Sequence, residues 1–146
     1  MNWFLRKFDE LSLNQLYQIL QLRQEVFVVE QTCPYLDADG ADNHAEHLFA
    51  RNEAGEMVAY ARIFQASEQQ SYARIGRVLT AQTVRRSGLG RELMTRAIDY
   101  LEQRAPGTPI RIGAQTYLLT FYQSFGFKAI SEEYLEDDIP HIDMER

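Results

Sequence analysis

The 146-residue sequence has one cysteine, Cys33, and no hydrophobic run long enough to cross a bilayer. A single cysteine excludes a fold held together by intrachain disulfides, and a transmembrane helix needs about 20 consecutive apolar residues. The first residues, MNWFLRKFDE, also lack the apolar core of a signal peptide. We therefore expect no membrane association and a location in the cytoplasm.

Basic residues are fewer than acidic ones, with 15 Lys and Arg against 21 Asp and Glu and a net charge of −6. A nucleic-acid partner is therefore not favoured, because phosphate backbones attract basic surfaces. The chain has no internal repeat, low-complexity tract or linker, and its length suits one domain with a sizeable core. Residues 1–146 are thus predicted to form a single domain.

Against this acidic background, the stretch RVLTAQTVRRSGLGR from Arg77 to Arg91 concentrates positive charge. Residues 78–80 are typical of the end of a buried strand, and residues 81–86 of a polar turn. Ser87-Gly88-Leu89-Gly90 then opens a helix that we expect to reach about Arg104. A helix start leaves backbone N–H groups unpaired and carries partial positive charge, so it favours an anion.

The composition of this turn makes a diphosphate the expected anion. Gly88 and Gly90 have no Cβ, so a phosphate can approach the main chain closely. Leu93 stands where a G-x-G-x-x-G fingerprint needs its third glycine, and no Gly-Lys-Ser/Thr ends a P-loop. The alternative is a turn that uses glycine only for packing. Three arginines add charges that suit phosphate recognition: Arg85, Arg86 and Arg91.

Hydrophobic periodicity predicts the element order β-α-β-β-β-α-β-α-β-β. Ser12 and Gln15 form a capping box before the first helix. Residues 31–43 are predicted as a loop, and the acidic segment EEYLEDD as a turn between the last two strands. The helices are expected at residues 13–30, 88–104 and 118–124. The strands are expected at residues 3–8, 47–51, 57–64, 72–80, 110–114, 127–130 and 139–144.

The spacing Arg85-x-x-Gly88-x-Gly90 resembles the acetyl-coenzyme-A signature of the GCN5-related N-acetyltransferases, the GNAT superfamily. The predicted element order is similar to that family too, and the segment FYQSFGF at 121–127 resembles its Phe-Tyr-x-x-x-Gly-Phe motif. The resemblance implies an α+β (α/β/α) fold with one domain. Its central mixed, mostly antiparallel sheet would be splayed at the two central parallel strands and flanked by helices.

In that family the coenzyme lies in the gap between the splayed strands. By position, the resemblance assigns the pantetheine and acetyl group to Val78, Leu79 and Thr80. An amide of Leu79 or a neighbour would polarise the acetyl carbonyl. The pyrophosphate is assigned to the residues of the turn: Arg86, Ser87, Gly88, Leu89, Gly90 and Arg91.

The same resemblance implies a role for Tyr122. In many members of the family this tyrosine is the general acid that protonates the leaving thiolate. A phenol suits this step because its pKa of about 10 is not far above that of a thiol. The alternative is that Tyr122 is an aromatic residue of the core.

Longer segments resemble the ElaA-like branch of the superfamily and together cover nearly the whole chain. This branch is assigned to the N-acetyltransferases by fold and motif, and the resemblance leaves its acceptor undefined. The segments are residues 22–35, 37–42, 59–63, 75–78, 113–115 and 139–142.

Transfer to an amine needs a base or a water relay that keeps the nucleophile neutral. Many relatives carry an acid or a histidine on the strand before the arginine turn, where this chain has Arg74 and Arg77. We select His141 as the base because it lies in a short, apolar-flanked strand and histidine titrates near neutral pH. A hydrogen-bonded structural histidine is the alternative. The other candidate bases are Glu30, His44, Glu46 and His47.

Two charged groups have structural interpretations. Arg23, Glu25 and Arg62 are expected to form a buried ion network that holds the first helix to the sheet. The acidic loop 37–42 is expected to attract a cationic acceptor amine, with a solvated loop as the alternative.

A metal site is not predicted. Cys33, His44 and His47 lie near three aspartates in the sequence, but their spacing is not that of a structural zinc site. A calcium loop of the EF-hand type would need an oxygen ligand where Ala41 stands.

We therefore expect an N-acetyltransferase that uses acetyl-CoA as co-substrate and acts on a primary amine of a small molecule or peptide. Two alternatives stay open. One is an acyltransferase of the acyl-homoserine-lactone synthase type on the same fold, and the other is a non-catalytic acyl-CoA-binding module. The oligomeric state is also open, a homodimer included.

Overall fold

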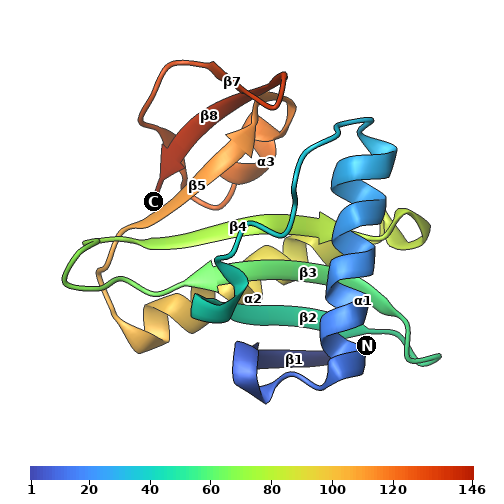
Figure 1. Cartoon of the computed structure of the whole chain (residues 1–146). Helices are drawn as coiled ribbons and strands as arrows, with labels where there is room; N and C mark the ends of the chain where they lie inside the picture. Colours follow the sequence, from blue (N-terminus) through green and yellow to red (C-terminus); the bar gives the residue numbers. More distant parts are fainter.

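Eight β-strands form one sheet in the spatial order β1-β2-β3-β4-β5-β8-β6, and β7 pairs with β8 (Figure 1). This computed structural model describes residues 1–146. The helices are α1 Leu13–Arg23, α2 Leu89–Arg104 and α3 Leu119–Gln123. The strands are β1 Asn2–Lys7, β2 Glu46–Arg51, β3 Met57–Phe64, β4 Ala73–Thr80, β5 Ile110–Gln115, β6 Lys128–Ala129, β7 Tyr134–Glu136 and β8 Ile139–Glu145. Only β4 and β5 pair in parallel, so the predicted mixed, mostly antiparallel sheet of an α+β fold is confirmed.

The predicted capping box starts α1. Ser12 Oγ accepts a hydrogen bond from the backbone N–H of Gln15 at 3.1 Å. In return, Gln15 Oε1 accepts one from the backbone N–H of Ser12 at 2.9 Å. α1 ends at Arg23, and the chain continues as a π-helical turn, Gln24–Glu30. The predicted helix over 13–30 therefore has the right limits, but its last part is wound more widely than an α-helix. Such turns are rare and often lie at functional sites.

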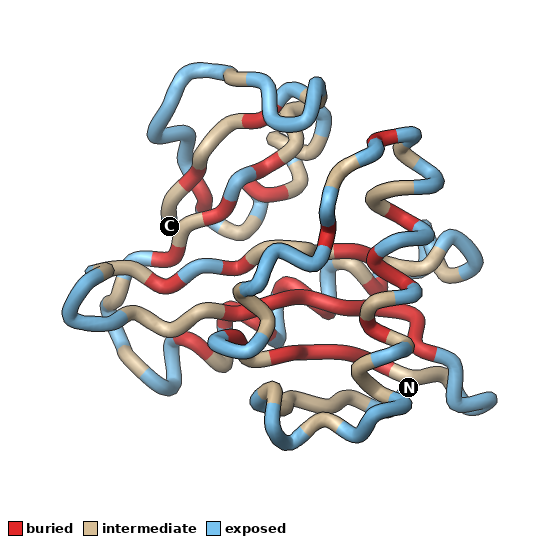
Figure 2. Tube along the Cα trace, in the orientation of Figure 1, coloured by how far each residue is buried: buried red, intermediate tan, exposed pale blue.

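The two long helices cover opposite faces of the sheet, with α1 in front and α2 behind in Figure 1. On the front face, Ile19 of α1 packs in a cluster with Phe49 and Tyr60. Because β3 lies between the two helices, it has no exposed residue (Figure 2). No helix has both the length and the apolar character that a membrane crossing requires. The side chains that α2 buries are Leu89, Leu93, Met94, Ala97, Ile98 and Leu101.

The parallel strands β4 and β5 pair at only two positions, Ala73 with Ile110 and Arg74 with Arg111. Beyond them the strands diverge (Figure 1). The later residues of β4 bond to β3 on one side only, so half of their backbone N–H and C=O groups face the gap. The predicted splay is confirmed, and it leaves an open strand edge in the middle of the sheet.

β4 also contains a bulge at the start of the splay. Its register against β3 shifts between Tyr60 and Arg62, so that Arg77 and Val78 both lie opposite Ala61. Arg77 has a φ of 48°, which residues other than glycine rarely adopt. A bulge re-aims the side chains beside it, and here it directs the Arg77 guanidinium to the loop that follows α1.

The C-terminal region differs from the prediction. The acidic segment 132–138, predicted as a turn, contains β7, whose Tyr134 pairs with His141 of β8. β6 has two residues, although a longer strand over 127–130 was expected. Strands this short carry too few residues for alternation to show in the sequence, and the ladder of β8 decides their extent.

The carboxylate of Asp37 joins the first helix to the bulge of β4. Arg23, fully buried at the end of α1, contacts Asp37 Oδ2 through Nε at 2.8 Å and Asp42 Oδ1 through Nη1 at 2.7 Å. Arg77 contacts Asp37 Oδ1 through Nε at 3.0 Å. These ion pairs fix the loop before β2 across the front of the sheet, between α1 and β4 (Figure 1).

Arg62 of β3 completes the network. Its guanidinium contacts Asp39 at 2.8 Å and Asp42 at 2.9 Å, and the hydrogen bonds from Arg62 hold the pKa of Asp39 well below its usual range. The predicted ion network of Arg23 and Arg62 is therefore confirmed, but Glu25 is exposed and takes no part in it. The prediction for Glu25 was wrong because the carboxylates come from the loop rather than from the helix.

Replacing Asp37 by Asn should destabilise the fold strongly, because it leaves the buried Arg23 and the half-buried Arg77 without the charge between them. We expect a loss of about 3 kcal/mol in the free energy of unfolding, measured by urea denaturation. Glu25→Gln is the control and should change the free energy by less than about 0.5 kcal/mol. Similar losses in both variants would contradict the role of Asp37.

Candidate functional site

A cleft of about 1150 Å³ lies in the gap between β4 and β5. One wall is the free edge of β4 together with the π-helical turn, and the other is formed by β5, α3 and the β7–β8 hairpin. Arg86 of the turn before α2 and Gly90 in the first turn of α2 lie at one end, and Tyr72 and Arg74 near the start of β4 lie at the other. The cleft therefore follows β4 along its length.

The β3–β4 ladder decides which backbone groups of β4 face the cleft. Ala81 N–H donates to a carbonyl of β3 at 2.8 Å. Because backbone direction alternates along an antiparallel strand, Leu79 N–H also points to β3, while Val78 and Thr80 point into the cleft. The Thr80 carbonyl is consistent with this direction, since it accepts hydrogen bonds from the Arg85 side chain in the turn.

The turn before α2 has the backbone of an anion site. Gly88 is the N-cap with a φ of 85°, no side chain caps the helix, and the first N–H groups of α2 have no partner within it. At Gly90, an added Cβ would meet nothing closer than Thr80 Cγ2 at 3.8 Å. Gly88 serves the left-handed turn and Gly90 leaves free space beside the helix start, so close packing explains neither glycine.

The three arginines of the turn differ in their partners. Arg85 forms a bidentate pair with Glu30 at 2.8 and 2.9 Å, so its charge is balanced. Arg91 donates to Ser124 Oγ at 2.8 Å and has no carboxylate partner. Arg86 makes no side-chain contact with an acid and has a φ of 66°. Arg86 and Arg91 therefore bring unbalanced positive charge to the helix start.

The structure brings most of the predicted coenzyme residues together. Five line the cleft: Val78, Leu79, Thr80, Arg86 and Gly90. Three are exposed beside it, two in the turn and one in the first turn of α2: Ser87, Gly88 and Arg91. Leu89 is the exception, because its side chain is buried in the core and leaves only its backbone for a ligand.

Tyr122 lies in α3 with 6% of its surface exposed and packs edge-on against Phe121 and Phe127. The ring is therefore part of the core, but the residue also lines the cleft and its hydroxyl has no hydrogen-bond partner in the protein. Burial raises the pKa of Tyr122 well above its ordinary value. The hydroxyl thus stays protonated and is free to donate to a group in the cleft.

His141 lies in β8, is buried and lines the same cleft. Its Nδ1 lies 2.7 Å from the Ile139 carbonyl oxygen. A carbonyl only accepts, so Nδ1 carries the proton and Nε2 is the basic nitrogen of the neutral ring. Nε2 lies 3.5 Å from Glu136 Oε2, and the ring stacks on Tyr134. The ring is thus held in one tautomer, with its basic nitrogen beside a carboxylate.

The other candidate bases are engaged or lie elsewhere. Glu30 is paired with an arginine, as described above, and Glu46 accepts hydrogen bonds from two neighbours. His47 is fully buried, and this burial lowers its pKa. His44 is exposed and does not line the cleft between β4 and β5.

Two contacts that the sequence did not predict join the walls of the cleft. Cys33 Sγ lies 3.3 Å from the carbonyl oxygen of Asp137, and the side-chain amides of Gln31 and Gln115 bond to each other at 3.3 and 3.4 Å. Both contacts connect the chain after α1 to the opposite wall. The partners lie 104 and 84 positions apart, so no local pattern could have indicated them.

The aspartates of loop 37–42 are not free charges. All three are paired with arginines of α1, β3 and β4, so the expectation that this loop attracts a cationic acceptor was wrong. The arginines come from three separate elements, which is why the loop looked unpaired in the sequence. No group of three or more His, Cys, Asp or Glu side chains is placed to hold a metal ion.

A family model described as an acetyltransferase (GNAT) domain matches residues 16–146. The chain belongs to this family. It is 45% identical over 141 residues to the protein ElaA of Escherichia coli K12, a match that covers 94% of this chain and 91% of ElaA. The resemblance of the sequence to the ElaA-like branch of the GNAT superfamily is therefore confirmed.

Solved structures agree with this assignment. An acyl-CoA N-acyltransferase from Pseudomonas aeruginosa has a TM-score of 0.94 and 42% identity, over 100% of this chain and 99% of that one. The structure of Escherichia coli ElaA has a TM-score of 0.93 and 43% identity, with the same coverage. The GNAT fold family uses acyl-CoA as co-substrate and transfers its acyl group to an acceptor.

Proposed function

We propose that this GNAT protein is an acetyl-CoA-dependent N-acetyltransferase that acts on the primary amine of a small molecule or peptide. One observation carries the proposal. A single cleft joins a glycine-opened helix start, an unpaired strand edge and a buried tyrosine whose hydroxyl has no partner. These are the groups that an acyl thioester with a diphosphate needs at its two ends.

The turn before α2 supplies the diphosphate site. Unpaired N–H groups at a helix start and the helix dipole favour an anion, and Arg86 and Arg91 add charges that no carboxylate of the protein neutralises. Gly90 leaves space for the phosphate oxygens to reach these N–H groups. Arg85 has a different role, because its pair with Glu30 fastens the turn to the end of the π-helical segment.

The free edge of β4 supplies the site of the thioester arm. Amide and carbonyl groups of the arm can hydrogen-bond to this edge as a neighbouring strand would. A backbone N–H group that polarises the acetyl carbonyl must face the cleft. The N–H of Val78 points into the cleft, whereas the N–H of Leu79 points to β3. We therefore assign polarisation of the carbonyl to Val78 N–H, which would stabilise the negative oxygen of the tetrahedral intermediate.

Tyr122 and His141 complete the reaction. A neutral amine attacks the thioester carbonyl, the carbon–sulfur bond breaks, and the electron pair leaves on sulfur as a thiolate. Tyr122 donates its hydroxyl hydrogen to this sulfur as general acid. Nε2 of His141 takes the proton that the amine releases, directly or through a water, and Glu136 stabilises the resulting imidazolium.

Acetyl-CoA should raise the melting temperature, because a ligand that binds only the native state stabilises it. At 100 times the dissociation constant the gain is about 2.7 kcal/mol, which corresponds to roughly 5–10 °C for a chain of this size. Gly90→Trp should abolish the shift by filling the space at the turn, and it avoids the backbone strain that any substitution at Gly88 introduces. The measurement is differential scanning fluorimetry.

Glu92→Trp is the matched control, because it adds the same side chain to the same helix outside the cleft. It should keep the shift produced by acetyl-CoA. If wild type shows no shift at millimolar acetyl-CoA, or if Gly90→Trp keeps it, the coenzyme site lies elsewhere.

Tyr122→Phe should lower kcat by about 10²-fold or more, because it removes the donor and leaves the ring packing intact. The shift in melting temperature with acetyl-CoA should stay within about 1 °C of wild type, since the hydroxyl is not needed for binding. Thiol release from acetyl-CoA measures turnover. A wild-type kcat would remove the acid role, and coenzyme binding without turnover in the wild type would favour the non-catalytic binding module.

His141→Asn should lower kcat/KM by about 10²-fold, because Asn can keep the bond to the Ile139 carbonyl but cannot take a proton. Thiol release from acetyl-CoA is the measurement. His44→Asn is the control and should leave kcat/KM unchanged. A wild-type kcat/KM in His141→Asn would assign the base to another group or to water.

A further inference from the structure

Three arginines lie in a row across the start of the splayed strands. Arg62 comes from β3, Arg74 from β4 and Arg111 from β5, and Arg74 is in register with both Phe64 of β3 and Arg111. The guanidinium carbons of Arg62 and Arg74 lie 5.1 and 5.8 Å from the centre of the Phe64 ring. Three like charges are therefore close together on neighbouring strands.

Two of these charges are balanced within the protein and the third is not. Arg62 is paired with the loop aspartates, and Arg111 contacts Glu145 at 2.7 Å. No carboxylate lies within ion-pair distance of Arg74, and its side chain makes no hydrogen bond to the protein. Like charges on adjacent strands repel, so an anion that binds Arg74 would relieve this repulsion.

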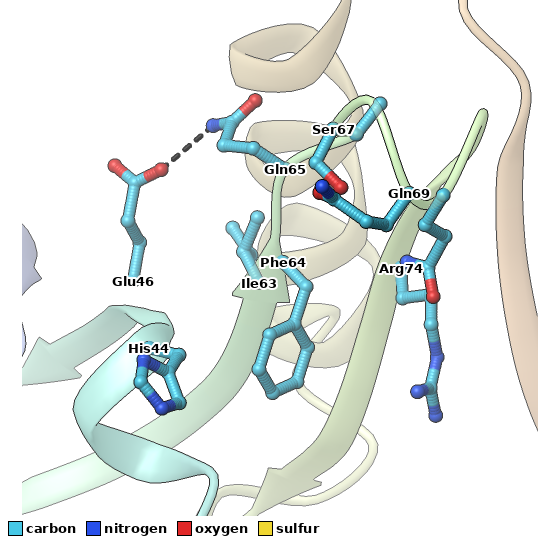
Figure 3. A pocket seen from close by; sticks show the side chains of 10 residues that line it. His44, Glu46, Ile63, Phe64, Gln65, Ser67, Gln69 and Arg74 are labelled. Atoms are coloured by element: carbon cyan, nitrogen blue, oxygen red, sulfur yellow. Dashed lines mark hydrogen bonds between the residues drawn. The ribbon is translucent and has the colours of Figure 1, made fainter.

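A hollow of about 500 Å³ adjoins the cleft at this point, and Phe64 and Arg74 line both. Figure 3 shows Arg74 on one side of Phe64 and Glu46 on the other, turned towards Gln65. The Glu46 carboxylate is occupied, because Gln65 and Tyr100 both donate hydrogen bonds to it. Glu46 is thus engaged in hydrogen bonds within the protein, whereas the Arg74 side chain has no ion-pair or hydrogen-bond partner.

The hollow around the unpaired Arg74 suits one negative charge. Its lining includes Ser67 and Gln69, which offer hydroxyl and amide donors, whereas the Gln70 amide already donates to the Tyr72 carbonyl. A single arginine can balance a carboxylate with two parallel hydrogen bonds. A phosphate group, with a charge of about −2, would need a second cation with no acid of its own, and the fully charged neighbours Arg62 and Arg111 are already paired.

The position of Arg74 also constrains the distance between the carboxylate and the reacting amine of an acceptor. Arg74 precedes Val78 by four residues, which is about 13 Å along a strand. The arginine side chain spans part of this distance, and the acceptor spans the rest. An amine that reaches the thioester beside Val78 would therefore be separated from a carboxylate at Arg74 by several bonds. The ε-amino group and α-carboxylate of lysine, or the two ends of a tripeptide, have this kind of separation.

We propose that Arg74 binds the carboxylate of the acceptor, so that the acceptor is an amino acid or short peptide with its reacting amine far from its carboxylate. This inference rests on the proposed acetyl transfer, because it assigns the acceptor end of the same cleft. Arg74 sets specificity and takes no part in the chemistry of the thioester.

The test compares two pairs of acceptors that differ only in the carboxylate. L-lysine is paired with cadaverine, and triglycine with triglycine amide, in a thiol-release assay with acetyl-CoA. In the wild type, the KM of the acceptor with the carboxylate should be about 10- to 100-fold lower, as expected for a hydrogen-bonded charge pair. Arg74→Gln should remove this difference by raising the KM of L-lysine and of triglycine.

Arg104→Gln is the matched control. Arg104 is an exposed arginine of α2 that lies over Tyr100, has no acid partner and does not line the cleft, so its replacement should keep the preference. Equal KM values within each pair in the wild type would overturn the inference and leave acetyl transfer intact. A preference for cadaverine would also overturn it and would point to the acidic hairpin 132–138 as the recognition surface.

If none of the four amines causes thiol release from acetyl-CoA, the result counts against the proposed acetyl transfer to such amines. A direct binding measurement then tests the carboxylate site on its own. Calorimetry with coenzyme A present would then compare N6-acetyl-L-lysine with N-acetylcadaverine. Tighter binding of N6-acetyl-L-lysine that is lost in Arg74→Gln supports the carboxylate site. Equal binding of the two compounds rejects it.

Discussion

The Asp37 carboxylate lies between two guanidinium groups that would otherwise repel each other, and this contact shapes the front of the molecule. Arg23 comes from α1 and Arg77 from the bulge of β4. Burying an ion without a partner costs several kcal/mol, so neither arginine can stay in place unless the loop supplies its carboxylates. In doing so, the loop brings Cys33 and Gln31 against the far wall of the cleft.

Ion pairing also distinguishes the arginines that hold the fold together from those whose charge is left unbalanced. Arg23, Arg62 and Arg77 have aspartate partners and hold elements together. Arg86 and Arg74 have none and line opposite ends of one cleft, and Arg91 lies beside the end that Arg86 lines. On a protein with a net charge of −6, this unpaired positive charge supports the proposals that both ends of the cleft bind anionic groups.

Local patterns accounted for most of the elements and for the glycine-bearing helix start. Ser12 and Gln15 showed where α1 begins, and the apolar positions of α2 showed which face it buries. The turn with Gly88 and Gly90 could be recognised in the sequence because the residues that open a helix are neighbours in the chain. The acidic loop was misread for the opposite reason, since the partners of its aspartates lie on distant strands and helices.

The sequence by itself determined the family and the element order apart from β7, and it located the glycine-bearing turn before α2. Each of these depends on periodicity or on spacing within a few residues. Only the tertiary structure decided which β4 amides face the cleft, which arginines are balanced and that β7 forms at all. These properties depend on strand register and on ion pairs between residues far apart in the chain. Register and pairing arise when the sheet assembles, and no local segment contains them.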